Sequence, residues 1–415
     1  MGRGPIRLTA VLLCLGLTFA AAPTALAATA LDRASVTSQQ ASTITKAGIV
    51  FRVVTTAFTS GYVESAISVA AQQTLLSTVD ADVKRIQVDH GRKFTTRPTL
   101  WAFATVKSFV TGLRVIFGVR NASTFEDAAG VYLSGKKAVA ISHEWMAEGT
   151  DPTAAATVRH ELTHAMVDQI VGKRGIGQVP AWLNEGSARL EEFTIDGLEW
   201  FDTSETYVAA SMANSGKLWT LEQMRLQSKW NARSGYLAFL QYAAAARAVA
   251  FLREDLGENA RVIEIMALLA KGTKFAAAYQ KIAGTPFTDF EKAFKARVLA
   301  TSDRYPGIAT AQDTPEGEGL YFVLYGFAPR SQVTYTIETG ATVRSTYTST
   351  TSEVGAYETY LTTGWPAGTY KITATGSVGT AETVVTKASG AAAVGAASAR
   401  ELAPTPFDRG RIPRR

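Results

Sequence analysis

Residues 156–171 read ATVRHELTHAMVDQIV, and the two histidines in this stretch, His160 and His164, stand four positions apart. On a helix, side chains at this spacing lie on one face, one turn above the other. Two imidazole nitrogens placed in this way can reach a single metal ion at about 2.0–2.1 Å. Glu161 follows the first histidine and is angled off that line, so it can touch a water on the ion without displacing it. The chain has four histidines in all, so a chance pattern of this kind would be rare.

Signals on both sides of this stretch predict a helix from residue 152 to about residue 171. Asp151 is a good N-cap, and Pro152 suits the first helical position. Gly172 is the expected C-terminal stop. A glycine-rich loop then leads to Pro180, which begins another helix, and the pattern stays mainly helical to about residue 300.

A catalytic zinc site needs a third protein ligand and one open position. The candidate is Glu185, in the stretch PAWLNEG at residues 180–186. It lies one turn into the second helix, and twenty residues separate it from His164. Two antiparallel helices would bring its carboxylate to the ion that the histidines hold.

The two motifs together, HELTH at 160–164 and WLNEG at 182–186, resemble the gluzincin metallopeptidases, and most of all the bacterial peptidase MA-like domains. The resemblance covers about residues 45–300. It implies that zinc is bound by His160, His164 and Glu185. It also implies that Glu161 is the general base, and later the acid for the leaving amine.

The stretch that begins at Tyr242 resembles a late helix of the same family, which carries a tyrosine that donates to the oxyanion. The resemblance therefore implies a catalytic role for Tyr242. Tyr236 lies six residues earlier and could serve instead, and either tyrosine could be a core residue. The strand expected at Ala138–Ser142 matches the edge strand that pairs with extended peptide in zincins. An ordinary internal strand is the alternative.

Other titratable residues around the motif carry weaker expectations. His143 and Glu144 are expected in a loop, and His90 in a turn. Asp168 could orient a metal ligand, although a surface carboxylate is the favoured interpretation. One of the adjacent pair Glu191 and Glu192 could bond a zinc histidine, although solvated charges are the default.

The N-terminus has the pattern of a secretory signal peptide, assigned to residues 1–28. Arg3 and Arg7 precede an apolar stretch, and Ala25-Leu26-Ala27 fits a cleavage site. An uncleaved anchor is the alternative. The single cysteine, Cys14, lies inside this segment. The mature chain would therefore lack disulfides, a thiolate nucleophile and cysteine-ligated zinc.

Composition divides the rest of the chain into three parts. Residues 29–304 are expected to form an α+β zincin-like metallopeptidase domain, with strands and helices in its N-terminal half and a helical C-terminal half. Residues 305–388 alternate in short runs rich in Thr, Tyr and Val, which predicts a small all-β sandwich resembling bacterial immunoglobulin-like modules. Such modules usually act as spacers or adhesion modules. Residues 389–415 are expected to be a flexible tail rich in Ala, Gly, Pro and Arg.

The net charge of +6 is misleading as a single number. The signal segment contributes two of these charges and the last sixteen residues contribute three, which leaves about one for the body of the chain. No nucleic-acid groove is therefore indicated. No segment after the signal is expected to span a membrane. The tail or the β domain could contact an anionic cell envelope.

These observations predict a secreted or extracellular zinc-dependent peptidase that acts on a peptide or protein substrate. The alternative is a catalytically inactive zincin-like scaffold in a cell-surface or matrix-binding protein. No amine-binding motif of an exopeptidase precedes the helix predicted at residues 152–171. Its absence favours an endopeptidase.

Overall fold

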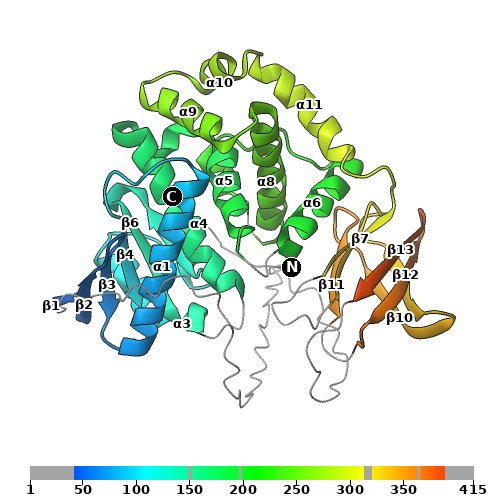
Figure 1. Cartoon of the computed structure of the whole chain (residues 1–415), viewed down its shortest axis with the longest axis horizontal. Coiled ribbons are helices and arrows are strands. Elements are labelled where there is room, and N and C mark those ends of the chain that lie inside the picture. The colour runs from blue at the N-terminus through cyan, green and yellow to red at the C-terminus, as the bar shows by residue number, and fades with distance from the viewer. Residues whose placement is uncertain are drawn as a thin grey trace, which may run out of the picture. The chain divides into compact units, whose positions relative to one another are not determined.

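The computed structural model describes residues 42–147, 152–195, 199–233, 235–312, 320–361 and 365–387. The expected signal peptide and the expected tail lie outside these residues. The described part has a mixed α/β fold, with one sheet near its start, a helical middle and two sheets at its end (Figure 1). No helix within the described ranges is both long and apolar enough to cross a bilayer.

The first sheet has six strands in the order β1-β2-β3-β4-β6-β5. Its strands are β1 (Ser42–Lys46), β2 (Ile49–Thr55), β3 (Ser60–Glu64), β4 (Thr99–Phe103), β5 (Gly130–Leu133) and β6 (Ala138–Ser142). Strand β4 pairs in parallel with β3 and β6, and the other pairs are antiparallel. Strand β6 thus lies between β4 and β5, so the expectation that Ala138–Ser142 is an edge strand is wrong. Every residue of β6 is buried, because β6 pairs with a strand on each side and both of its faces are covered. The edge strand next to β6 is β5, and β1 forms the opposite edge.

Helices cover both faces of this sheet. They are α1 (Val69–Asp89), α2 (Val106–Val115), α3 (His143–Ala147) and α4 (Pro152–Val171). In β4, Leu100 and Ala102 share a core with buried residues of α1 and α4. The alternate residues Trp101 and Phe103 share a second core with α2. This alternation is the period of two that a strand requires, and it presses α4 against the sheet.

The helical middle is built around α5, which packs between α4 and α8. Its helices are α5 (Ala181–Glu192), α6 (Glu199–Asn214), α7 (Gln227–Trp230), α8 (Tyr236–Leu256), α9 (Asn259–Ala270), α10 (Phe275–Ala283) and α11 (Phe287–Leu299). Short 3₁₀ turns occur at Ala122–Phe125, Ser134–Lys136, Gly172–Arg174 and Ile176–Gln178. Helices α5 and α8 approach closely at Gly186, where an added Cβ would lie 2.4 Å from the carbonyl oxygen of Ala245. This contact sets the position of the turn that carries Glu185.

Two antiparallel sheets follow the helices. One has the order β11-β8-β7 and the other β10-β9-β12-β13. Their strands are β7 (Gly307–Gln312), β8 (Leu320–Tyr325), β9 (Gln332–Thr339), β10 (Thr342–Thr350), β11 (Tyr357–Leu361), β12 (Gly368–Gly376) and β13 (Gly379–Lys387). Side chains from both sheets form one buried cluster, which includes Phe322, Tyr335 and Ile372. These strands lie within residues 305–388, where the sequence predicted short β runs.

Strand β8 has buried residues on both faces. Phe322 and Leu324 point into the cluster between the two sheets. The alternate residues Tyr321, Val323 and Tyr325 belong instead to the large core that includes the helices. Helix α6 is the helix that packs on this face of the sheet.

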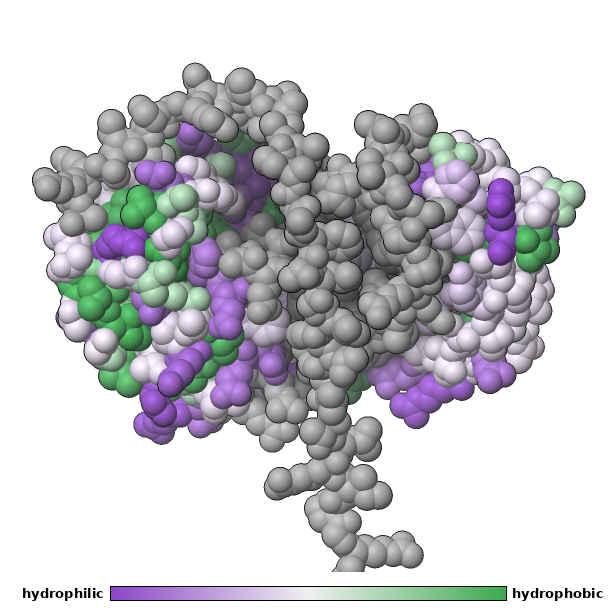
Figure 2. Space-filling model, turned by 90° about the horizontal axis from the view of Figure 1, so that it is seen from below, coloured by the Kyte–Doolittle hydropathy of each residue, from purple (hydrophilic) through white to green (hydrophobic). Residues whose placement is uncertain are grey.

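The surface is mixed in character. On the face drawn in Figure 2, hydrophobic residues lie in separate groups among hydrophilic ones. The large hydrophobic residues with the greatest exposure, Val88 and Val384, belong to α1 and β13 respectively. Isolated exposed valines of this kind are normal on a protein surface and identify no docking site.

Candidate metal centre

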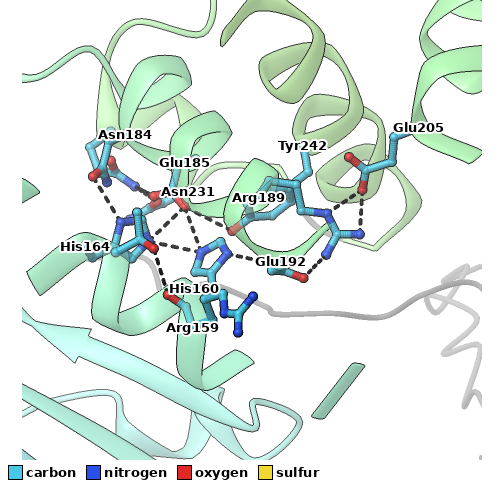
Figure 3. A network of polar contacts seen from close by, with 12 residues as sticks. Arg159, His160, His164, Asn184, Glu185, Arg189, Glu192, Glu205, Asn231 and Tyr242 are labelled. Carbon is cyan, nitrogen blue, oxygen red and sulfur yellow. Dashed lines mark hydrogen bonds and ion pairs between the residues drawn. The ribbon is translucent and has the colours of Figure 1, made fainter. Parts of the chain in front are cut away.

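The three side chains expected to bind metal lie together. His160 and His164 project from α4, and Glu185 projects from α5 (Figure 3). The two histidine Nε2 atoms are 3.0 Å apart. Glu185 Oε2 lies 3.6 Å from Nε2 of His160 and 3.4 Å from Nε2 of His164. All three residues are buried, and one ligand atom from each lies within 4.8 Å of the others.

Local sequence explains how the two helices reach this position. Helix α4 begins at Pro152 and ends at Val171, as predicted, and Gly172 follows with a φ of +64°. Gly175 also has a positive φ, of +74°, which L side chains rarely adopt. The chain can therefore reverse within a few residues and start α5, which packs against α4.

Hydrogen bonds on the far side of each imidazole fix which nitrogen faces the centre. His160 Nδ1–H donates to Glu192 Oε1 at 2.6 Å. His164 Nδ1–H donates to Asn184 Oδ1 at 3.0 Å. A neutral imidazole that donates from Nδ1 has a free lone pair on Nε2. Both histidines thus present a metal-binding nitrogen to the same point, and each has the outer partner that such ligands usually have.

The donor set fits zinc. Two neutral imidazoles and one carboxylate form one of the usual ligand sets of a catalytic zinc ion. Ligand bonds of about 2.0–2.1 Å in tetrahedral geometry place neighbouring ligand atoms about 3.3–3.4 Å apart. The three separations in this structure, 3.0, 3.4 and 3.6 Å, bracket that distance. Two lone pairs facing each other at 3.0 Å would repel without a cation or a proton between them.

Glu161 is buried beside this group without belonging to it. Burial raises the pKa of its carboxyl, while His160 and His164 act in the opposite direction. The backbone N–H of Tyr132, in the edge strand β5, donates to the carboxylate. Gly130 in the same strand allows the close approach, because a Cβ there would lie 3.3 Å from Glu161 Cγ. The side chain is thus held at the edge of the sheet by its neighbours.

Of the two candidate tyrosines, only Tyr242 lies at the centre. Its hydroxyl is 3.4 Å from Glu185 Oε2, and its ring centroid is 6.0 Å from that of His160. Burial, with the nearby Glu185, holds the pKa of Tyr242 well above 10, so the hydroxyl keeps its proton. Tyr236 instead bonds Ser352 and lies near Glu358, both in the C-terminal sheet region.

Sequence reasoning missed Gln227, on α7. Its Nε2 donates to Glu185 Oε1 at 3.2 Å, which leaves Oε2 directed at the histidines. No local motif marks this residue, because α7 lies about forty positions from Glu185 and meets it only in the folded chain. Asn184, by contrast, stands next to Glu185 in the quoted motif.

The expectations for three outlying residues need correction. Asp168 is buried, and its carboxylate accepts hydrogen bonds from the Tyr132 hydroxyl at 2.6 Å and from the Ile176 amide at 3.1 Å. It therefore ties the β5–β6 hairpin to α4, and the surface interpretation is wrong. Glu191 and Glu192 are also buried, not solvated.

Neither remaining histidine lies at the centre. His143 begins the short helix α3, and its neighbour Glu144 accepts from the Val106 amide at 2.6 Å. His90 is the C-cap residue of α1, and its Nδ1 bonds the Ile86 carbonyl at 3.0 Å.

Comparison with known proteins agrees with this geometry. Residues 134–300 match the family model described as Peptidase MA superfamily, a range that includes the two histidines, Glu185 and Tyr242. The match supports a zincin-like peptidase domain in this part of the chain. No curated protein matches the chain.

Among solved structures, the chain is similar to Legionella pneumophila aminopeptidase A, crystallised in complex with aspartic acid. The identity is 10% and the TM-score is 0.37. The similarity covers 79% of this chain and 35% of that one, so the chain spans about a third of the length of the aminopeptidase.

Proposed function

We propose that this chain is a secreted, zinc-dependent peptidase. The observation that carries the proposal is the convergence of His160 Nε2, His164 Nε2 and Glu185 Oε2 on one point. Zinc is the metal that this donor set suits. When bound there, zinc would polarise a substrate carbonyl and lower the pKa of a water to about 7.

Glu161 is the proton carrier in this proposal. Its carboxylate is not one of the three converging ligand groups, yet it interacts electrostatically with all of them. It would take a proton from the attacking water as the new carbon–oxygen bond forms. The same proton would then pass to the departing amine nitrogen as the peptide bond breaks. The raised pKa of this carboxyl suits a group that both accepts and returns a proton.

Tyr242 would stabilise the charge that develops on the substrate oxygen. Its hydroxyl retains its proton and lies at the centre, so it can donate a hydrogen bond to that oxygen. Its present neighbour, Glu185 Oε2, is one of the ligand atoms, so the hydroxyl lies beside the point where the metal would bind.

Strand β5 is the proposed site for the substrate backbone. It is one of the two edge strands of the sheet, and it is the one that borders Glu161. An extended peptide could add to this edge as a further strand and place its scissile bond beside Glu161. This arrangement favours an extended peptide or protein segment as the substrate. The strand proposed to pair with the substrate is thus β5, and not its neighbour Ala138–Ser142.

The inactive-scaffold alternative is less well supported. A scaffold would have no use for a buried Glu161 beside two histidines that are each oriented by an outer partner. The proposal includes two further expectations from the sequence. Residues 1–28 would direct secretion, and the tail or the β domain would contact the cell envelope.

The proposal is tested on the purified full-length secreted chain. Zinc is measured by elemental analysis, and hydrolysis of a mixed peptide library is followed with and without a chelator. We expect about one zinc per chain and cleavage that stops with the chelator and returns with added zinc. A zinc-loaded chain that cleaves no peptide in the library would defeat the peptidase assignment, and a chain that binds no zinc would defeat the metal assignment.

A further inference from the structure

A buried ionic network extends from the metal centre into α6. Arg189, on α5, is 3% exposed, and its guanidinium contacts Glu192 on the same helix. The same guanidinium donates from Nε and Nη2 to Glu205 Oε1, each at 2.5 Å. Figure 3 shows Arg189 between these two carboxylates, with His160 on the far side of Glu192.

This network restricts the outer partner of His160. Glu192 uses Oε1 to accept from the imidazole and Oε2 to accept from Arg189. Its carboxylate therefore cannot rotate without losing one of two charge-assisted bonds. The Arg189 guanidinium is itself fixed by Glu205 and by the ring of Phe201, whose centroid lies 4.8 Å from it.

Burial makes this arrangement costly. Removing charged groups from water carries a large desolvation penalty, and apolar side chains of similar size often stabilise a core as well or better. A buried arginine with two buried carboxylates is thus weak evidence for a purely stabilising role. Its planar fork, which can hold two carboxylates in fixed directions, suits a positioning role instead.

The preceding residue of α6 extends the connection to the C-terminal sheets. Ser204 Oγ donates to Glu358 Oε2 at 2.6 Å. The Tyr321 hydroxyl donates to the same oxygen, also at 2.6 Å. Glu358 belongs to β11 and Tyr321 to β8. Two adjacent residues of α6 thus contact different parts of the chain: Glu205 bonds the network at the metal centre, and Ser204 bonds the β domain.

A second anchor lies two turns further along α6. Ser211 is fully buried, donates to the Val354 carbonyl at 2.8 Å and accepts from the Gly326 amide at 2.9 Å. Residues seven apart lie on the same face of a helix, so Ser204 and Ser211 hold that face at two points. The apolar side chains of β8 that belong to the large core fill the same region.

We infer that Arg189 and Glu205 are positioning residues for His160, and that the β7-β8-β11 sheet holds α6 in place for them. The β domain is then a structural part of the catalytic unit and not a spacer on a linker. The inference rests on the proposed function only in naming zinc as the ion that His160 binds.

The first test measures zinc affinity by competition with a chromophoric chelator. Replacing an outer-sphere partner commonly weakens metal binding by about 10- to 100-fold, and we expect this range for Arg189→Met and Glu205→Gln. Arg189→Lys, which keeps the charge but not the fork, should recover part of the loss. The matched control is Arg225→Met, which removes an exposed i,i+3 ion pair with Glu222 and should leave zinc affinity unchanged.

Spectroscopy separates positioning from loss of folding. The cobalt-substituted Arg189→Lys and Glu205→Gln variants should show altered visible absorption while circular dichroism matches the wild type. Combining Arg189→Met with Glu192→Gln should weaken zinc binding no more than the stronger single change, because both act through one group. Wild-type zinc affinity and cobalt spectra in the folded Arg189→Lys and Glu205→Gln proteins would overturn the inference.

The second test addresses the β domain. Glu358→Gln should weaken zinc binding by roughly two- to thirty-fold, the range found for substitutions that act through an intervening element. Glu382→Gln is its matched control, because this exposed carboxylate in β13 pairs with Lys371 and accepts a hydrogen bond from Thr373, both in the neighbouring strand β12. An equal effect of the two substitutions would show that the sheet does not hold α6 for the metal centre.

A metal-free readout keeps this inference separate from the proposed function. In histidine-labelled apoprotein, NMR should detect the His160 Nδ1–H proton in the wild type, shifted by its bond to Glu192. Arg189→Lys should change that signal whether or not the wild type hydrolyses peptides. An unchanged signal would count against the positioning role even in an active zinc enzyme, and a changed signal would support it even in an inactive one.

Discussion

Gly186 faces the backbone of Ala245 so closely that a β-carbon on the glycine would lie 2.4 Å from the alanine carbonyl oxygen. The contact joins α5 to α8 directly beside Glu185. Because the nearest atoms are backbone, no side-chain movement can relieve a clash there. The two helices would have to separate.

Gly186→Ala should therefore reduce both stability and metal binding. Overpacking of this kind costs about 1–3 kcal/mol, and the displaced helix would move Glu185 away from the histidines. Urea unfolding and zinc titration measure the two effects. Gly135→Ala is the control, since nothing lies within 4 Å of its added carbon and its φ is not positive. Equal stability of the two variants would refute the packing argument.

Glu161→Gln should keep zinc and lose hydrolysis. The amide retains the shape of the side chain but cannot accept the proton, so kcat should fall by at least about 10²- to 10⁴-fold. Elemental analysis and peptide turnover are measured on one preparation. The exposed carboxylate Glu222, changed to glutamine in the same way, provides the control. Retained turnover in Glu161→Gln would require another base.

His164→Ala should lose zinc and hydrolysis together, because it removes one of three converging ligand atoms. His143→Ala is the matched control, since this partly buried histidine of α3 is outside the ligand group. Zinc content and turnover again provide the measurement. Full zinc occupancy in His164→Ala would show that the ion binds elsewhere.

Tyr242→Phe should lower kcat while zinc content stays unchanged. Loss of one oxyanion donor costs about 10²- to 10³-fold in other hydrolases, and the tyrosine hydroxyl is the proposed donor here. Tyr236→Phe is the control, because that side chain lies against Ser352 and Glu358. Similar kcat values for the two variants would remove Tyr242 from the mechanism.

His90 and Glu191 form a buried pair away from the metal ligands, with His90 Nδ1 3.7 Å from Glu191 Oε1 and with Asp89 and Arg253 nearby. Burial lowers the pKa of His90 from 6.5 to about 4. Burial also raises the pKa of Glu191 from 4.5 to about 7. Between pH 4.5 and 6.5 the folded pair thus holds one proton, on Glu191, and the unfolded pair holds one, on His90. The pair adds no pH dependence to stability in this range.

Glu191→Gln should expose the pH dependence of His90. In the unfolded chain His90 binds a proton below pH 6.5, whereas the folded imidazole binds one only below about pH 4. The free energy of unfolding therefore decreases as the pH falls. We expect the stability gap to the wild type to widen by about 1–2 kcal/mol between pH 6.5 and pH 5. Urea unfolding at both pH values measures it, with Glu222→Gln as the control. A constant gap would mean that folded His90 binds the proton.

The metal helix and the three converging side chains could be predicted because their geometry is local. Spacing on α4 fixes the relation of His160 to His164, and the loop to α5 is short. Strand order is not local. Ala138–Ser142 has the composition of any buried strand, and only pairing with the distant β4 makes it internal.

Burial of charge was the other property that sequence could not give. Glu191 and Glu192 have the composition of a solvated helix face, yet they pair with residues of other elements, Glu191 with Arg253 on α8 and Glu192 with His160 on α4. The apolar spacing of residues 62–85 also predicts a helix that begins at residue 62, and the structure differs. Tyr62 and Val63 pair in β3, and α1 starts only after the N-cap Ser68.

The alternation along β8 has a consequence for how the chain melts. Sliding this strand by one residue against its neighbours would turn Phe322 and Leu324 toward the helices and Val323 toward the other sheet. The packing of both cores would be disrupted at the same time, so we expect the two cores to unfold together. Heating should consequently give one calorimetric peak for the helical and C-terminal regions, with no plateau in which one has melted and the other survives.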